Sequence, residues 1–370
     1  MPTAAVPVIR TRISRVPASD AARWQEHLDG VPHDFYHSAA YHRFCEETGG
    51  GQAFLARYEE GGRRLLWPYL LRAVEGFGCA GLRDVTSVYG YAGPLGCPSP
   101  DPAFLLRAWR ALADLWRSDG VVCAFTRLHP LLENHSLLPA TCPPRVTGQT
   151  VSIDLRRPPG DIWRDYRKSL RYDIRAARAA GVVVEEDVAL SCLEGFSSLY
   201  LETMTRNGAD AGYLFDYAYF RRLFRRLGGG AHLMTARCRG RLIAGAVFAG
   251  CGDSLQYHFS ATAGGALHHS PAKLLLDEIR LWGQARNYKV LHLGGGRGSR
   301  ADSLFSFKAG FSRRRHAFYT WRSVLEPSVY EELSTIRRRE IHEAGSECEE
   351  NFFPLYRSPR RVAALAAAGQ

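Results

Sequence analysis

Apolar residues recur along the chain in two patterns, one with helical spacing and one in short runs that are typical of strands. Between 101 and 118, Leu105, Trp109 and Leu112 recur at spacings of four and three, which places them on one face of a helix. Before residue 139 the pattern predicts a strand from residue 10, a helix at 21–27, a helix at 39–48, strands at 53–58 and 64–71, a helix at 101–118 and a strand at 121–128.

A stretch without periodicity at 139–147 contains three prolines, and we place a domain boundary there. Beyond it, similar segments return. The pattern predicts a strand at 150–155, a helix at 161–180, a strand at 182–186, helices at 193–207 and 216–227, strands at 232–237, 242–249 and 254–262, a helix at 271–286, a strand at 289–293 and a short helix at 302–309.

The order of elements in the second half loosely repeats that of the first, although no sequence repeat of fixed period is present. We therefore expect an α/β protein in which one topology is used twice. Each copy would be a mixed, largely antiparallel sheet flanked by helices, which is the layered arrangement of the acetyltransferase (GNAT) type.

Charge bears on the class of partner. The 48 basic and 37 acidic side chains give a net charge of +11, and only four of the basic residues are lysines: Lys168, Lys273, Lys289 and Lys308. The surplus favours a polyanion, a phosphate-bearing substrate or an anionic membrane surface, although a solubilising charge with no partner fits it too.

Compartment is predicted from what the sequence lacks. No apolar run approaches the ~18–20 residues of a membrane span, and residues 1–15 lack the apolar core of a secretory signal. Nine cysteines without a CxxC pair fit reduced thiols better than a disulfide framework. We expect a cytoplasmic protein with no stable membrane insertion.

The sequence lacks the signature motifs of several enzyme classes. The motifs GxSxG, HExxH and GxxxxGK[ST] are absent, and the glycine run that begins at Gly294 has Ser299 where GxGxxG requires glycine. We therefore predict no metal and no bound cofactor. A CoA pyrophosphate loop, R/Q-x-x-G-x-G/A, occurs in letters at 225–230, but a strand follows it there, and the segment 262–273 lacks the arginine or glutamine. Acyl-CoA is therefore disfavoured as a donor.

Five cations recur on the expected helix at 161–180, at spacings of 4, 3, 4 and 3. They are Arg164, Lys168, Arg171, Arg175 and Arg178. Like charges at these spacings repel one another, so the stripe fits a helix against which phosphates lie. The alternative is a solvated face with nearby aspartates as partial partners.

Two further segments carry candidate chemistry. Lys308 lies in an aromatic setting between Phe305 and Phe311, where it would be a fixed positive charge, or else one exposed lysine on an amphipathic helix. The segment 84–94 places glycines beside Tyr89 and Tyr91, which fits a rigid turn that presents phenols, or a purely structural turn.

Together these segments resemble the Fem-type (FemABX-like) aminoacyl-tRNA-dependent transferases of the GNAT superfamily, over roughly residues 30–330. The resemblance implies an N-terminal GNAT-like domain at 1–148, completed by 320–370, and a C-terminal one at 149–319 that carries the basic helix and Lys308. The matching stretches are 167–177 before Gly181, Tyr257-His258, Ser270-Pro271, 292–296, 307–311 and the turn at 89–94.

The resemblance also implies an activity. Such enzymes move an aminoacyl group from aminoacyl-tRNA, as co-substrate, to an amine, classically on a peptidoglycan precursor. Members that act on those precursors commonly carry an acidic residue soon after the Gly-Pro turn, but here the first acid is Asp101. A peptide or antibiotic intermediate is therefore also open as the acceptor. The alternatives are an acyl-CoA-dependent N-acyltransferase and an idle binding module.

Roles for single residues follow from this interpretation. Lys308 would stabilise the charge that develops on the carbonyl oxygen, or hold the terminal tRNA phosphate. Phe307 would shape the pocket. The remaining candidates are substrate-binding residues: Lys168, Arg171, Arg175 and Arg297 for phosphate-bearing substrate, and Tyr89, Tyr91 and Tyr257 for the acceptor.

Overall fold

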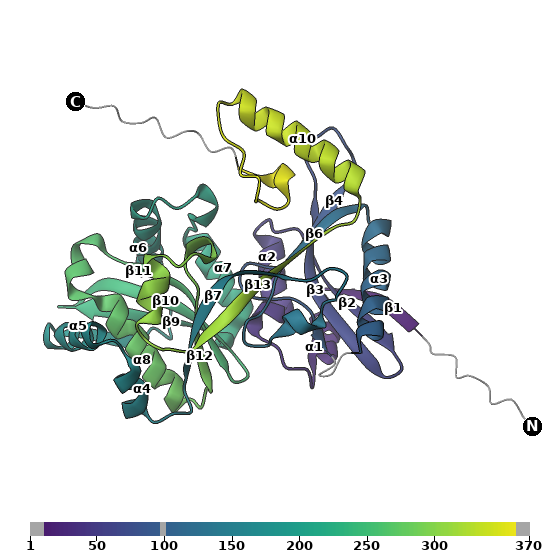
Figure 1. The fold of residues 1–370 in the computed structure, drawn as a ribbon. Coiled ribbons are helices and arrows are strands. Elements are labelled where there is room, and N and C mark those ends of the chain that lie inside the picture. The colour runs from purple at the N-terminus through teal and green to yellow at the C-terminus, as the bar shows by residue number, and fades with distance from the viewer. Residues whose placement is uncertain (1–10, 97–100, 360–370) are drawn as a thin grey trace, which may run out of the picture. The chain divides into compact units, whose positions relative to one another are not determined.

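The structure is a computed structural model that describes residues 11–96 and 101–359 (Figure 1). The chain divides into two compact units. The first comprises the described residues of 1–32, 45–145 and 319–370, and the second comprises 33–44 and 146–318. The sequence prediction assigned residues 33–44 to the N-terminal domain, whereas in the structure they pack with the second unit.

The first unit contains a mixed sheet with strand order β1-β2-β3-β4-β6-β13, in which β4 and β6 are parallel and the other neighbours antiparallel. The short β5 pairs with β3. Its elements are β1 (Thr11–Pro17), α1 (Ala21–Leu28), β2 (Gln52–Glu60), β3 (Arg63–Ala73), β4 (Arg83–Thr86), β5 (Leu95–Gly96), α3 (Pro102–Ser118), β6 (Val121–Arg127), β13 (Arg315–Val324), which begins in the second unit, and α10 (Pro327–Glu343).

Helix α3 covers this sheet with an apolar face. Phe104 and Trp116 of α3 are fully buried against Trp67 of β3 and Trp321 of β13, and the rings of Trp67 and Trp116 meet edge to face at 5.8 Å. Such aromatic packing removes a large apolar area from water and fixes the helix on the sheet. The sequence pattern predicted α3, whereas β13 and α10 were not predicted.

The second unit is also built on a mixed sheet, with strand order β7-β12-β11-β10-β9-β8, in which only β11 and β12 are parallel. Its elements are α2 (Ala39–Glu47, shared with the first unit), β7 (Arg145–Asp154), α4 (Pro159–Asp165), α5 (Lys168–Ala179), β8 (Val182–Glu186), α6 (Leu193–Arg206), α7 (Tyr217–Leu227), β9 (Ala231–Cys238), β10 (Arg241–Cys251), β11 (Ser254–Thr262), α8 (Pro271–Ala285), β12 (Val290–Gly294) and α9 (Ser303–Ala309).

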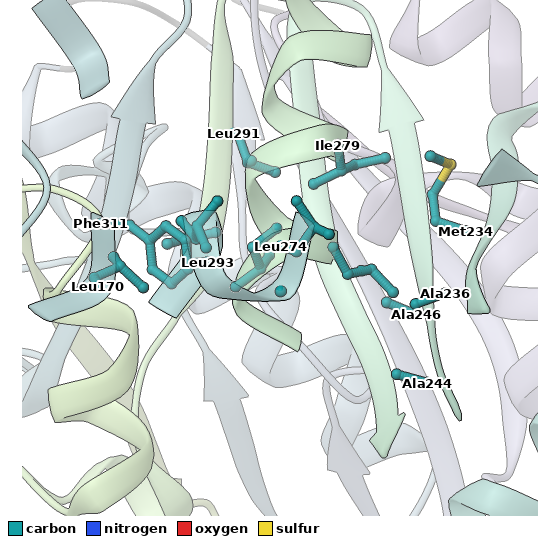
Figure 2. Close-up of a cluster of buried hydrophobic side chains, with 14 of the residues drawn as sticks. Leu170, Met234, Ala236, Ala244, Ala246, Leu274, Ile279, Leu291, Leu293 and Phe311 are labelled. Carbon is teal, nitrogen blue, oxygen red and sulfur yellow. The ribbon is translucent and has the colours of Figure 1, made fainter. Parts of the chain in front are cut away.

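Helices cover both faces of this second sheet. Ala244 and Ala246 of β10 belong to a buried cluster with Leu274 and Ile279 of α8 (Figure 2). Gly245 between them faces the other way, because a Cβ atom there would come within 2.7 Å of the Phe196 ring of α6. Successive strand residues point to opposite faces, so α8 and α6 lie on opposite sides of the sheet.

The two units share one topology. In each, four antiparallel strands are followed by a helix and then by a strand that runs parallel to the fourth: β1 to β4, α3 and β6 in the first unit, and β8 to β11, α8 and β12 in the second. This confirms the prediction of an α/β protein with a GNAT-like topology used twice.

Candidate active site

In the second unit, the hydrogen-bonded ladder between the parallel strands β11 and β12 ends where the two strands separate. We call this position the opening. The two strands pair only from Ser254 to Gln256 and from Val290 to His292. Beyond Gln256, β11 stays paired with β10, with a bulge at His258, since Phe248 pairs with Tyr257 and Val247 with Phe259. A bulge bends a strand and re-aims its side chains. The carboxyl ends of parallel strands that separate are a common position for ligands in α/β sheets.

Lys308 of α9 lies at this opening. Its side chain is buried, its Nζ donates a hydrogen bond of 2.7 Å to the carbonyl oxygen of Gly295 just after β12, and Nζ lies 5.7 Å from the ring centroid of Tyr257 on β11. Burial lowers the pKa of Lys308 to about 8, which Asp302 partly offsets. Close to neutral pH this amine can therefore be a cation or a neutral base.

Helix α9 fixes this lysine because its N-terminus is capped. Asp302 accepts hydrogen bonds from the backbone N–H groups of Phe305 at 2.9 Å and of Arg297 at 3.1 Å. Arg297 also forms an ion pair with Asp302 at 3.3 Å. The predicted substrate-binding Arg297 is thus tied to the cap of the helix that carries Lys308, with its side chain half exposed.

Phe307 precedes Lys308 on α9, and Tyr257 of β11 lies near its amine. Phe307 is partly buried against the core of the second unit, and its ring contacts Phe311 at 5.5 Å. Tyr257 is also partly buried, and burial raises the pKa of its phenol to about 12. Tyr257 is therefore neutral at physiological pH. Tyr257 and Lys308 thus lie close together, and their roles in the reaction stay predictions.

The predicted single helix at 161–180 is wrong. The chain forms two helices, α4 and α5, because Tyr166 and Arg167 adopt extended ψ angles of 142° and 144°. The hydroxyl of Tyr166 donates to Asp277 at 3.1 Å, and the Arg167 N–H donates to the Gly310 carbonyl at 2.9 Å. The Arg167 contact takes the place of a helical backbone hydrogen bond, and the Tyr166 side chain anchors the break between α4 and α5.

The basic stripe is correspondingly shorter than predicted. Arg164 stays on α4, where it pairs with Asp161, and Arg178 pairs with Asp277 and Glu278 of α8. The other three cations of α5, Lys168, Arg171 and Arg175, share its face with Arg178, and Arg175 lies 5.6 Å from the Trp163 ring centroid. No carboxylate of the described chain forms an ion pair with these three residues.

Tyr89 and Tyr91 belong to the first unit, in a turn held by Asn134. The buried Asn134 side-chain amide donates to the carbonyls of Ala92 at 2.8 Å and Pro94 at 3.0 Å. Tyr89 is exposed, and the ring of Tyr91 lies 6.4 Å from that of His129. These two hydrogen bonds hold the turn, and the role of the tyrosines in acceptor binding stays a prediction.

The loop between β11 and α8 has an acidic partner of its own. The backbone N–H of Gly264 donates to Oε1 of Glu202 at 2.7 Å, and Arg206 of the same helix forms an ion pair with that carboxylate at 3.1 Å. The segment 225–230, which matches the CoA loop only in its letters, includes the end of α7 at Leu227. A strand, β9, follows it and not a helix, as expected. Within the described residues, no three His, Cys, Asp or Glu side chains are grouped to hold a metal ion.

Sequence reasoning missed a buried chain of polar groups beside the opening. Nδ1 of His292 donates to Oε1 of Gln256 at 2.7 Å, and Nε2 of Gln256 donates to Oδ2 of Asp34 at 2.9 Å. All three side chains are almost fully buried. Gln256 and His292 are the last residues at which β11 and β12 pair with each other. Since Asp34 and Gln256 are 222 residues apart, no local pattern could have connected them.

Comparisons with known proteins agree with this architecture. Residues 164–302 match a family described as "Acetyltransferase (GNAT) domain". A sequence comparison with curated proteins gave no match. The solved structure of FemX is similar, with a TM-score of 0.62 at 12% identity, over 86% of this chain and 99% of that one.

Two further solved structures share the fold. One is the C-terminal domain of a putative lysylphosphatidylglycerol synthetase from Agrobacterium fabrum, with a TM-score of 0.54, 14% identity and coverage of 82% of this chain and 91% of that one. The other is L-PGS from Bacillus licheniformis, with a TM-score of 0.52, 13% identity and the same two coverages, 82% and 91%.

The chain therefore has a GNAT-type fold, and its residues 164–302 match the acetyltransferase (GNAT) domain family. More particularly, the tandem arrangement is similar to that of FemX over 86% of this chain. These findings support the prediction of an amide-forming transferase. In the described part of the chain, no helix has the length and apolar character that crossing a membrane requires.

Proposed function

We propose that this protein transfers an aminoacyl group from aminoacyl-tRNA to an amine and forms an amide bond. The observation that carries the proposal is the buried Lys308, whose Nζ is fixed by the Gly295 carbonyl where β11 and β12 part. The resemblance of the sequence to Fem-type transferases and the FemX-like fold support the same activity.

In this reaction the acceptor amine attacks the ester carbonyl that joins the amino acid to the terminal ribose of the tRNA. A carbon–nitrogen bond forms, the ester carbon–oxygen bond breaks, and the ribose hydroxyl leaves with the proton that the amine loses. Negative charge develops on the carbonyl oxygen. We propose that the Lys308 ammonium stabilises that charge, and one such contact is worth about 3–4 kcal/mol in the transition state.

The other predicted residues have supporting roles. Phe307 and Tyr257 would shape the pocket around Lys308, and Lys168, Arg171 and Arg175 of α5 would bind phosphates of the tRNA or the acceptor. Arg297 would bind a phosphate beside α9. Tyr89 and Tyr91 would contact the acceptor. No bound cofactor is needed, because aminoacyl-tRNA is an activated ester and would be encountered in the cytoplasm.

The acceptor would be an amine of a peptidoglycan precursor or of a peptide or antibiotic intermediate. Leu95 and Gly96 follow the Gly93-Pro94 turn, where members that act on peptidoglycan precursors commonly carry an acid. Screening both classes of amine against one charged tRNA pool would decide between them.

The donor is tested by turnover with and without RNase. We expect product only when charged tRNA is supplied, loss of activity after RNase treatment, and no recovery on addition of acyl-CoA. Full activity with acetyl-CoA after RNase treatment would contradict the proposal. Deacylated tRNA is the control, because it has the phosphates but no ester.

An acyl-CoA-dependent N-acyltransferase is the second candidate, and the match of residues 164–302 to an acetyltransferase domain favours it. The loop before α8 argues against it. A CoA pyrophosphate needs free backbone N–H groups at this position, whereas the Gly264 N–H is bonded to Glu202. The same donor experiment distinguishes the two candidates.

A further inference from the structure

The segment that joins α6 to α7 (Figure 1) and the first residue of α7 carry exposed tyrosines. Tyr213, Leu214 and Tyr217 are 40%, 42% and 42% exposed, respectively, within five consecutive residues. Large apolar side chains scattered singly over a surface need no explanation, but such a group in one loop does. Only Leu214 among the three is aliphatic, so the surface consists mainly of aromatic rings.

These rings rest on a rigid support. Phe215 stacks on Tyr219 of α7, with ring centroids 3.8 Å apart and planes 4° from parallel, and also on Tyr200 of α6 at 5.9 Å. Phe259 of β11 meets Phe215 edge to face at 5.7 Å. The loop is thus fastened to the sheet by aromatic packing, and its exposed side chains are presented on an ordered base.

The same surface is basic. Helix α7 carries four arginines and no carboxylate: Arg221, Arg222, Arg225 and Arg226. Its apolar face, which includes Phe220 and Leu223, is buried. The guanidinium of Arg221 lies 5.9 Å from the ring centroid of Tyr217, which joins the basic side chains to the exposed rings.

Exposed aromatic rings beside arginines are the combination that binds unpaired nucleotides. Bases stack on the rings, while the cations contact the phosphates between them. In a base-paired duplex the base faces are stacked inside the helix, so its phosphates can contact the arginines but its bases cannot stack on the rings. An anionic membrane would also meet the charge, but α7 turns its apolar face inward and leaves only Leu214 as an aliphatic side chain for insertion.

We infer that Tyr213, Tyr217 and Arg221 form a stacking surface for the unpaired end of an RNA. The inference rests on the proposed function, since the unpaired 3′ end of aminoacyl-tRNA is the RNA segment that bears the reacting ester. It adds a binding surface on α7 and the segment before it, on the opposite side of the sheet from α8 and from the phosphate-binding residues proposed on α5.

Binding of a short RNA tests the inference without any turnover. The probe is a fluorescein-labelled single-stranded RNA nonamer that ends in CCA, titrated with the full-length protein and followed by fluorescence anisotropy. The variant is Tyr213→Ala with Tyr217→Ala. One lost base–ring stack weakens binding by about fivefold or more, so we expect at least tenfold for the pair. A blunt duplex of the same sequence should bind more weakly and be insensitive to the change.

Two matched variants separate stacking from charge. Tyr172→Ala removes a tyrosine of α5 that is 71% exposed, and should leave the affinity for the nonamer unchanged. Arg221→Gln should reduce the slope of log affinity against log salt by about 0.7, whereas the tyrosine pair should leave the slope unchanged. Circular dichroism and the melting temperature confirm that each variant is folded.

Several results would overturn the inference. They are an unchanged affinity in the tyrosine pair, an equal loss in Tyr172→Ala, and duplex binding as tight as single-strand binding. Flotation with phosphatidylglycerol vesicles that depends on the two tyrosines, or a dimer in sedimentation that is lost in the pair, would assign the surface to a membrane or to a second copy instead.

Failure of the proposed function is distinguishable from failure of this inference. If charged tRNA supports no transfer but the nonamer binds as expected, only the proposed chemistry fails. If transfer depends on charged tRNA but the tyrosine pair binds the nonamer normally, only the stacking surface fails.

Discussion

The hydroxyl of Tyr41 lies 3.2 Å from Nε2 of His258, although 217 residues separate them in the sequence. Tyr36 holds the other ring nitrogen, with 3.3 Å between its hydroxyl and Nδ1. His258 is the extra residue of the bulge in β11, next to Tyr257. Burial lowers the pKa of His258 to about 3, so the ring is neutral and can donate to one hydroxyl and accept from the other.

Removing both hydroxyls should destabilise this part of the second unit. Tyr36→Phe with Tyr41→Phe keeps the rings and their packing but removes both hydrogen bonds to His258. We expect the free energy of unfolding to fall by about 1–3 kcal/mol, measured by urea unfolding. Tyr172→Phe, on the surface of α5, is the control and should change nothing. Equal stability of the double variant and the wild type would show that the hydroxyls contribute no net stabilisation.

A second prediction concerns the loop before α8. Because Glu202 accepts from the Gly264 N–H and no arginine or glutamine is available at the required offset in 262–273, acetyl-CoA should show no saturable binding by calorimetry. Its addition at millimolar concentration should also leave the melting temperature unchanged. Submillimolar binding of acetyl-CoA would contradict this and favour the acyl-CoA-dependent alternative.

Lys308→Ala should lower turnover by about 10²–10³-fold, because it removes the fixed charge at the carbonyl oxygen. The matched control is Lys289→Ala, which removes a lysine that is half exposed and paired with Asp253. Lys289→Ala should retain full activity. A wild-type rate in Lys308→Ala, with an unchanged melting temperature, would exclude Lys308 from the mechanism.

The pH dependence of turnover should separate a cationic from a basic role for Lys308. With a pKa of about 8, a cation is lost as the pH rises through 8, so the rate should then fall. Lys308→Arg stays charged over this range and should lack that descending limb. A rate that instead rises through pH 8 in the wild type, and is lost in the arginine variant, would assign Lys308 the role of a base.

The same lysine links stability to pH. Its folded-state pKa is depressed below the usual 10.5, so the unfolded chain binds more protons between about pH 8 and 10.5. The contribution of Lys308 to the free energy of unfolding should therefore rise over that interval. Urea unfolding of wild type and Lys308→Met at pH 7 and pH 10 measures it, and the difference between the two proteins should change in favour of the wild type at the higher pH.

Phosphate binding by α5 is tested with Arg171→Ala and Arg175→Ala combined. The affinity for tRNA should fall, and the slope of log affinity against log salt should shrink by roughly 0.7–0.9 for each phosphate contact that is lost. Arg164→Ala is the control, because Arg164 lies on α4 and pairs with Asp161. An unchanged slope in the double variant would show that this face of α5 is merely solvated.

Local pattern was sufficient for most elements, including the short helix that carries Lys308, because apolar spacing and capping are properties of short segments. It failed where distant contacts decide the structure. The break at Tyr166 depends on Asp277 and Gly310, more than 100 residues away. Likewise, residues 33–44 join the second unit through Asp34, Tyr36 and Tyr41, whose partners are on β11.

The first unit has the same parallel strand pair, β4 and β6, but the pair does not part. The Ser87 N–H continues the ladder to the Phe125 carbonyl at 3.0 Å, and the Ala92 N–H bonds to the Arg127 carbonyl at 3.1 Å. One copy of the topology is thus sealed by its own backbone while the other is open. The two copies therefore present different edges to a ligand, since the backbone groups that follow β4 are paired with those of β6, whereas β11 and β12 pair no further than Gln256 and His292.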